Sequence, residues 1–146
     1  MSLELDITLF RPDRPGIRKV LGDLEADIME LIWARPAEVG TTVRDIFEIL
    51  YQQRHLAYTT VMSTMTRLAR KRMLQVEKHE QTYIYTPTVT KQEFISHLVS
   101  RILEDLFVSF SGPTLEGVGA LSNQEAAAHA RTLLDEITRR RAEEGQ

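Results

Sequence analysis

The sequence lacks cysteine altogether, since none of its 146 residues carries a thiol. This absence excludes disulfides, thiolate ligands for metals, thiol redox sensing and a cysteine nucleophile. Long apolar runs are also missing, because no stretch of about 18 consecutive apolar residues occurs. We therefore expect no membrane insertion. Neither a glycine-rich phosphate loop nor a Gly-x-Ser-x-Gly nucleophile motif is present.

What is present is the composition of a globular protein, with 42% hydrophobic and 27% charged residues. The N-terminal residues lack the charged-then-apolar plan of a signal peptide, so we expect a cytoplasmic protein. The net charge of −3 argues against a nonspecific nucleic-acid coat, but the charge is uneven. Residues 91–146 carry six basic and nine acidic residues, whereas residues 49–76 carry five basic residues and no acidic one. The local potential, rather than the sum, decides where a charged partner docks.

Residues 58–72 are predicted to form a helix with two unlike faces. Val61, Met65 and Leu68 recur at i, i+4 and i+7, which makes one apolar stripe. The other face carries small hydroxyls and then arginines, namely Thr59, Thr60, Ser63, Thr66, Arg67 and Arg70. Hydroxyl groups can reach phosphates or base edges, and arginine supplies charge and a bidentate fork. We therefore predict that these six residues contact double-stranded DNA.

The residues that follow this helix predict a β-hairpin. Residues 74–79 and 82–87 alternate in polarity and are rich in β-branched and aromatic side chains, with a short polar break at Glu80 and Gln81. A helix that enters a DNA groove followed by a hairpin is the plan of a winged helix-turn-helix, in which the hairpin is the wing.

Two helices are expected before the basic one. The first follows Asp23, which resembles an N-cap, and ends before Pro36. Its apolar stripe comprises Leu24, Ile28, Leu31 and Ile32. The second helix is expected over residues 43–54, capped by Thr41 or Thr42. The order helix, helix, short turn, helix, hairpin completes the winged helix-turn-helix.

The segment over residues 11–20 is basic and irregular. Its cations are Arg11, Arg14, Arg18 and Lys19. Pro12, Pro15 and Gly16 argue against helix there. Two interpretations remain open, a tail laid on the domain surface and a basic arm near DNA. We favour the tail, because charge runs are usually solvated.

A long apolar helix is expected after the hairpin. Thr90 and Glu93 form a capping-box pattern at its start, and it should run to about Phe110. Its apolar positions are Phe94, Ile95, Leu98, Val99, Ile102, Leu103, Leu106, Phe107 and Phe110. This is more apolar surface than one small domain can bury, so the helix needs a partner. Leu98, Ile102 and Leu106 share one face and are our candidates for the seam of a homodimer.

The C-terminal part is predicted as a loop and then a helix. Ser111, Gly112 and Pro113 break the preceding helix, and the sequence to Ala120 reads as a glycine-rich loop. Ser122 and Glu125 form another capping-box pattern, which opens a helix over residues 122–141. Its inward side chains are expected to be Ala127, Ala130, Leu133, Leu134 and Ile137. Two helices of this kind appended to a DNA-binding head are typical of a dimerisation arm.

No set of residues suggests catalysis. The four histidines lie on different predicted elements without metal-ligand spacing, and we expect no metal, no cofactor and no enzymatic activity. The basic helix has a structural explanation as well, because cations favour a helix C-terminus and Arg67 can pair with Glu48 or Asp45. That explanation does not account for the four hydroxyl residues on the same side, which are poor helix formers. We favour DNA contact.

Four segments in order resemble the BlaI/MecI-like penicillinase repressors. LGDLEADIMELIW is similar to their first helix, TTVRDIFEIL to their second, AYTTVMSTMTRLARKRML to their recognition helix, and YIYTPTVTKQEF to their wing strand and the start of the dimerisation helix. The resemblance covers residues 21–96. It implies a homodimeric transcriptional repressor that binds a two-fold symmetric operator.

Departures from that family concern DNA contact and regulation. Thr59 and Met62 stand where the family has basic residues, and Arg72 replaces the glycine of its Lys-Lys-Gly turn. The family is regulated by a membrane metalloprotease that cuts the C-terminal arm at an Asn–Phe bond. Here Ser109 precedes Phe110 instead, so a regulatory protease stays an open alternative. The copper-responsive branch uses cysteine ligands, which are absent.

The sequence therefore predicts a mostly α fold with a small β-hairpin wing, an α+β class, made of a winged helix-turn-helix head and a C-terminal helical dimerisation arm. The expected divisions are an N-terminal extension over residues 1–20, a DNA-binding domain over residues 21–88 and a helical dimerisation region over residues 89–146. The alternative function is a winged-helix protein-interaction module without DNA binding. A small-molecule sensor with a pocket in the arm also remains open.

Overall fold

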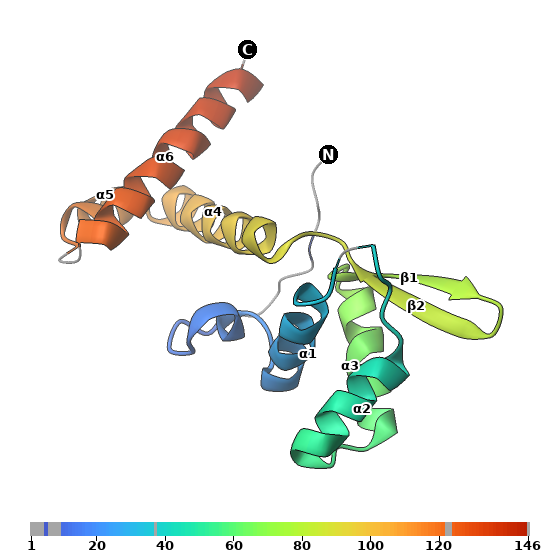
Figure 1. Cartoon of the computed structure of the whole chain (residues 1–146). Helices are drawn as coiled ribbons and strands as arrows, with labels where there is room; N and C mark the ends of the chain where they lie inside the picture. The colour runs from blue at the N-terminus through green and yellow to red at the C-terminus, as the bar shows by residue number, and fades with distance from the viewer. Residues whose placement is uncertain (1–4, 6–9, 37, 122–123, 146) are drawn as a thin grey trace. The chain divides into compact units, whose positions relative to one another are not determined.

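The computed structural model describes residues 5, 10–36, 38–121 and 124–145. The chain divides into two compact units, Met1–Lys91 and Gln92–Gln146 (Figure 1). We call the first unit the head and the second the arm.

Three helices form the body of the head: α1 (Asp23–Trp33), α2 (Val43–Arg54) and α3 (Tyr58–Arg70), preceded by a short 3-10 helix, η1 (Gly16–Lys19). Their inner faces build one core, whose most deeply buried side chains include Ile28, Met29, Ile46, Leu50, Val61, Met65 and Leu68. These residues recur at helical spacing, so one stripe of each helix is removed from water. The predicted stripes of the three helices therefore meet in a single core.

The ends of α1 and α2 show how the sequence starts each helix. At α2, the Thr42 hydroxyl accepts a hydrogen bond from Asp45 N at 3.1 Å, and the Asp45 carboxylate accepts one from Thr42 N at 3.0 Å. This reciprocal capping box confirms Thr42 as the cap. The prediction of Asp23 as the α1 cap is wrong, because the N-cap is Gly22. The Glu25 carboxylate accepts from Gly22 N at 3.0 Å, which leaves Asp23 free for ion pairs.

The turn after α3 uses a left-handed residue. α3 ends at Arg70, two residues before the predicted end, and Arg72 has a φ of 63°. That conformation is the one glycine adopts most readily, so Arg72 keeps the turn in spite of its side chain. Thr88, 16 residues further along the chain, stabilises this turn, because its hydroxyl donates to the Arg72 carbonyl at 2.7 Å.

The wing is a two-stranded antiparallel hairpin, β1 (Leu74–His79) and β2 (Thr82–Pro87), with the bounds that the alternation predicts. The hairpin extends away from the three helices (Figure 1). Its base is tied to the loop before α2, because Thr41 and Tyr85 exchange backbone hydrogen bonds of 2.9 and 2.8 Å. Gly40 beside this bridge has no room for a side chain, since a Cβ there would overlap the Ile84 side chain.

The arm consists of α4 (Lys91–Ser109), α5 (Ser111–Gly119) and α6 (Gln124–Glu144). The predicted loop over residues 111–120 is wrong, because most of it forms α5. Pro113 falls in the first turn of α5, where a backbone N–H has no helical partner to lose. Thr114 joins the two helices, since its hydroxyl donates to the carbonyls of Leu106 at 3.1 Å and Phe110 at 2.6 Å.

The last helix matches its prediction only in part. Ser122, the predicted cap, lies outside the described residues, and α6 extends to Glu144, beyond the predicted end at residue 141. Ala127 is buried, as expected, and Ala130 is half-buried. The side chains of the other predicted inward residues, Leu133, Leu134 and Ile137, also lie outside the described part.

The predicted fold class is confirmed: the chain is mostly α-helical, and its head is a winged helix with one hairpin. Among the described helices, none is both long enough and apolar enough to cross a membrane.

Candidate nucleic-acid interface

The outer face of α3 exposes every predicted contact residue: Thr59, Thr60, Ser63, Thr66, Arg67 and Arg70 are all exposed. The inner face of the same helix, with Val61, Met65 and Leu68, is fully buried. The apolar stripe therefore anchors the helix in the core. The six polar residues face outward, and we call this face the ridge. Recognition helices of winged helix-turn-helix proteins expose such a ridge to the major groove.

The hydroxyls on this ridge differ in what they can offer a ligand. Ser63 donates to the Thr60 carbonyl at 3.2 Å, and Thr66 donates to the Met62 carbonyl at 2.8 Å. Their protons are engaged in the helix, so these oxygens are set to accept hydrogen bonds, as from the amino group of adenine or cytosine. Thr59 has no hydrogen-bond partner in the described part of the chain, so its hydroxyl can still donate to a phosphate oxygen.

The two arginines on the ridge also differ. Arg70 is exposed and has no ion-pair partner among the described residues, so its whole guanidinium is available to a ligand. Arg67 is partly engaged, with its Nε 3.9 Å from Glu25 and its side chain 52% exposed. The suggestion that Arg67 pairs with Glu48 or Asp45 is wrong. Its partner lies on α1, because α3 packs its Arg67 side against that helix.

Glu25 is a buried acid at the edge of this ridge. Lys71 Nζ lies 2.9 Å from its Oε2 atom, so the carboxylate is paired. Burial raises the pKa of Glu25, but hydrogen bonds from Lys71 and from the Gly22 backbone outweigh it and hold that pKa below its ordinary value of 4.5. The carboxylate is therefore charged at neutral pH. Sequence reasoning missed this residue, whose only local signal is its capping position three residues after Gly22.

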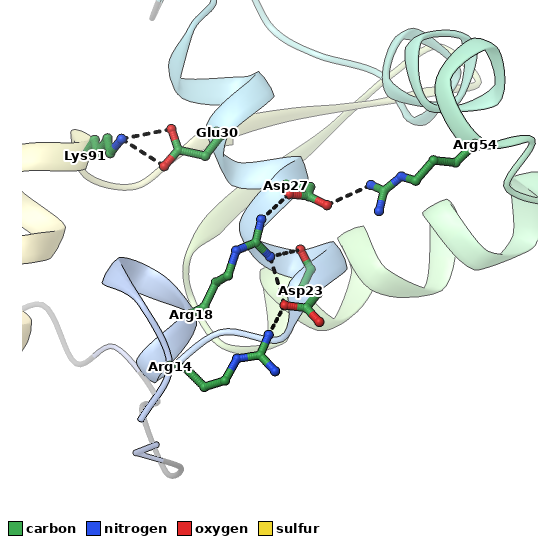
Figure 2. A network of polar contacts seen from close by, with 7 residues as sticks. All are labelled: Arg14, Arg18, Asp23, Asp27, Glu30, Arg54 and Lys91. Atoms are coloured by element: carbon green, nitrogen blue, oxygen red, sulfur yellow. Dashed lines mark hydrogen bonds and ion pairs between the residues drawn. The ribbon is translucent and has the colours of Figure 1, made fainter. Parts of the chain in front are cut away.

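A second acid of α1, Asp27, binds two more cations (Figure 2). Arg18 lies 2.5 Å from one carboxylate oxygen of Asp27, and Arg54 lies 2.7 Å from the other. Arg14 and Arg18 both pair with Asp23. The segment over residues 11–20 is thus held on the surface of α1 by ion pairs, which agrees with the favoured interpretation as a tail.

The charge of residues 49–76 is therefore smaller at the surface than in the sequence. Arg54 is paired with Asp27 and Lys71 with Glu25, and Arg67 lies at the edge of the second pair, so acids of α1 offset part of this charge. Of the exposed arginines in this stretch, Arg67, Arg70 and Arg72 lie in the C-terminal half of α3 and the turn after it.

Aromatic side chains flank the N-terminal end of α3. The ring of Phe47 lies 5.5 Å from that of Tyr51 and 5.3 Å from that of Tyr58, measured between centroids. Tyr58 and Met62 are both exposed beside the polar ridge. These groups give the basic face an apolar border, which suits contact with sugars and thymine methyl groups.

The wing is polar and carries charges of both signs. Lys78 lies opposite Tyr83 in the register, with its Nζ 5.7 Å from the ring centroid. His79 Nε2 lies 3.3 Å from the carboxylate of Glu77, which is two residues earlier on the same face of β1. Glu80 occupies the tip. The wing therefore brings a single lysine on β1 and no continuous basic surface.

The predicted dimer residues lie on α4 in three different environments. Leu98 is buried within the single chain, Ile102 is half-buried, and Leu106 is exposed. The described residues contain no group of three or more histidine, aspartate or glutamate side chains placed to hold a metal ion.

Comparison with known proteins places most of the chain in one family. Residues 21–138 match the family described as penicillinase repressor. The proteins named transcriptional regulator BlaI from two strains of Mycobacterium tuberculosis are each 37% identical over 79 residues, which is 54% of this chain and 56% of theirs. An uncharacterised 16.5 kDa protein of Latilactobacillus sakei is 28% identical over 91 residues, 62% of this chain and 60% of its own.

The chain thus spans little more than half the length of the curated relatives that it matches. A solution structure of the DNA binding domain of the repressor BlaI covers 56% of this chain and 95% of its own, with 21% identity and a TM-score of 0.45.

Proposed function

The chain belongs to the penicillinase repressor family, and on that premise we propose that it is a DNA-binding transcriptional repressor acting as a homodimer. Residues 21–88 would bind DNA, with α3 in a major groove and the wing near a phosphate backbone. Residues 89–146 would hold two copies together, so that two heads meet the two halves of a symmetric operator. Such a protein would act in the cytoplasm.

The observation that carries this proposal is the outer face of α3. Its residues are exposed, they include no acid, and their hydroxyls and guanidinium groups supply both acceptors and donors. A solvent-facing helix with no ligand would gain more from Glu–Lys pairs at i,i+4 than from threonines and serine. Arg70, which has no ion-pair partner in the part of the chain that the structure describes, and the partly paired Arg67 are suited to phosphate oxygens and guanine edges.

The test is selection of bound fragments from the source genome, followed by titration of binding against salt. A repressor selects a two-fold symmetric sequence and binds it about 10³–10⁷-fold more tightly than random duplex. The logarithm of its affinity falls with the logarithm of salt by roughly 0.9 for each phosphate neutralised. The alternative interaction module selects no sequence and shows no steep salt dependence, and that outcome would refute the proposal.

A further inference from the structure

The buried carboxylate of Glu25 joins the α1 N-terminus to α3. Glu25 is 6% exposed, and it contacts both Gly22, three residues before it, and Lys71, 46 residues after it. One oxygen accepts from Gly22 N at 3.0 Å, and the other lies 2.9 Å from Lys71 Nζ and 3.9 Å from Arg67 Nε. It thereby reaches from the cap of one helix to the side of another.

Capping alone does not explain a charge at this position. Glutamine serves the third position of a capping box as well as glutamate does, because either side chain can accept from the cap N–H. A buried carboxylate loses its hydration, and a well-packed neutral residue is often as stable. The negative charge therefore has a use beyond starting α1, and the groups that face it are Arg67 and Lys71.

Arg67 has an ion-pair contact and a long hydrogen bond along one edge of its guanidinium. Its Nε faces Glu25, and its Nη2 lies 3.4 Å from the Thr64 hydroxyl oxygen. Thr64 is itself buried and fixed, because its hydroxyl donates to the Thr60 carbonyl at 2.8 Å. Nη1 has no protein partner in the described part of the chain. An arginine that is restrained along one edge and open along the other loses less side-chain entropy when it binds a ligand.

We propose that Glu25 is a positioning residue for DNA recognition, which holds Arg67 so that its free edge meets the paired acceptors of a guanine in the major groove. Lys71 offsets the negative charge of Glu25, so the carboxylate orients Arg67 without repelling the phosphates. The proposal rests on the proposed function and adds to it a residue that would not touch DNA. Arg67 reads the base, and Glu25 acts only through Arg67.

Positioning and simple electrostatics predict opposite changes in operator affinity when the charge of Glu25 is removed. Removing a carboxylate beside α3 raises the local positive potential, so electrostatics alone would tighten binding to every duplex. Positioning predicts that Glu25→Gln weakens the selected operator by about tenfold, in the range of coupling between contacting residues, while random duplex binds as well as before or better. Glu30→Gln is the matched control, because it makes the same charge change on α1 and breaks only the surface pair with Lys91.

A double-mutant cycle identifies the residue through which Glu25 acts. In an Arg67→Ala background, Glu25→Gln should cost no further operator affinity, because the group it positions is gone. If Glu25→Gln costs the same tenfold with and without Arg67, or if it behaves like Glu30→Gln, the positioning role is overturned.

Two further measurements separate this role from folding and from the function itself. Glu25→Asp keeps the charge and shortens the reach, so positioning predicts a loss of operator affinity in a protein whose thermal unfolding stays above the assay temperature. In the free full-length protein, nuclear magnetic resonance should show a distinct Arg67 Nε–H signal that Glu25→Gln moves to the position of exposed arginines. A parent that selects no DNA overturns the function and the recognition role together. A parent that binds while this signal does not depend on Glu25 overturns the positioning alone.

Discussion

The head and the arm of this protein differ in how completely they bury their apolar side chains. In the head, the apolar stripes of α1, α2 and α3 bury one another, and many surface charges are paired. In the arm, large apolar side chains remain exposed, with Val108 at 72% and Phe110 at 61%. Leu106, Leu115 and Leu121 are exposed as well. The head thus has a finished core, whereas the arm carries an apolar surface typical of an interface.

The two regions therefore expose two different surfaces that are suited to binding a partner. On the head it is polar and basic, and it matches a polyanion. On the arm it is apolar, and it matches another apolar surface such as that of a second copy. On the proposed function, DNA binding and dimerisation would therefore use separate residues. Substitutions in one region should then change one property directly and the other only through the link between two half-sites.

The largest effect on operator binding is expected from a substitution that disrupts the proposed dimer interface of the arm. Ile102→Asp places one charge per subunit in the apolar face of α4, where a charge that leaves water without a partner costs several kcal/mol or shifts its pKa. Each buried Leu or Ile contributes about 1.5–3 kcal/mol to such a seam before association costs. We expect a monomer by analytical ultracentrifugation, and operator binding lost at concentrations that saturate the parent.

Ser96→Asp is the control for that experiment. It introduces the same charge at an exposed polar position of α4, and it should leave the dimer and the operator affinity unchanged. The fluorescence of Trp33, the single tryptophan, reports the head alone and should be the same in both variants. A dimeric, fully binding Ile102→Asp variant would mean that α4 does not form the dimer interface.

A smaller loss of operator affinity is expected from substituting single arginines on the outer face of α3. Arg70→Ala or Arg67→Ala should cost ~1–3 kcal/mol of operator binding without changing the oligomeric state. If the lost contact is a phosphate, affinity falls alike on all sequences and the salt slope decreases by about one. If it is a base, one operator position loses its preference. Arg131→Ala on α6 removes an exposed arginine far along the chain and should change neither. Unaltered binding in both ridge variants would reject this face as the DNA contact.

The elements of the head were predictable from the sequence because their signals are local. The alternation of residues 74–79 and 82–87 predicts both strands with their observed bounds, and the start of α3 follows from the apolar stripe that begins at Val61. α5 was not predictable by the same rules, because glycine and proline normally indicate a loop. Pro113 lies in the first helical turn, where it costs no hydrogen bond.

The partners of the basic residues could not be read from the sequence. Arg54 pairs with Asp27 and Lys71 with Glu25, across separations of 27 and 46 residues. Such pairs depend on how α1 packs against α2 and α3, and counting charges along the chain treats all these cations as free. The six exposed residues of the ridge were predictable, because helical periodicity alone separates them from the core. Their contact with DNA stays a prediction.

Acidification should weaken the head by a moderate amount. Burial raises the pKa values of Glu25 and Asp27, but their cationic partners outweigh burial and hold both below the ordinary values of 4.5 and 3.8. The unfolded chain then binds protons more readily than the folded one, so this stabilisation is complete above those ordinary values and is lost as pH falls through the folded values.

The measurement is the free energy of unfolding in urea from pH 7 to pH 3, followed by Trp33 fluorescence. The parent should lose stability below about pH 5, and Glu25→Gln and Asp27→Asn should each flatten that fall. Glu30→Gln, at a surface ion pair, is expected to leave the pH dependence as it is in the parent. A parent with constant stability down to pH 3 would show that these pairs do not stabilise the head.

The smallest effect is expected at the tip of the wing. Glu80 has a φ of 59°, which costs an ordinary residue about 1–2 kcal/mol, whereas asparagine tolerates the left-handed region better. Glu80→Asn should therefore raise the free energy of unfolding by roughly 0.5–1 kcal/mol, a few degrees in melting temperature for a domain of this size. Gln81→Asn, at the neighbouring turn position where φ is negative, should give no such gain. Glu80→Asn also removes an acid, so the affinity for DNA should rise slightly at low salt if the wing lies near phosphates. A stabilised variant with unchanged salt dependence would confine DNA contact to α3, and the head would then meet DNA through one helix only.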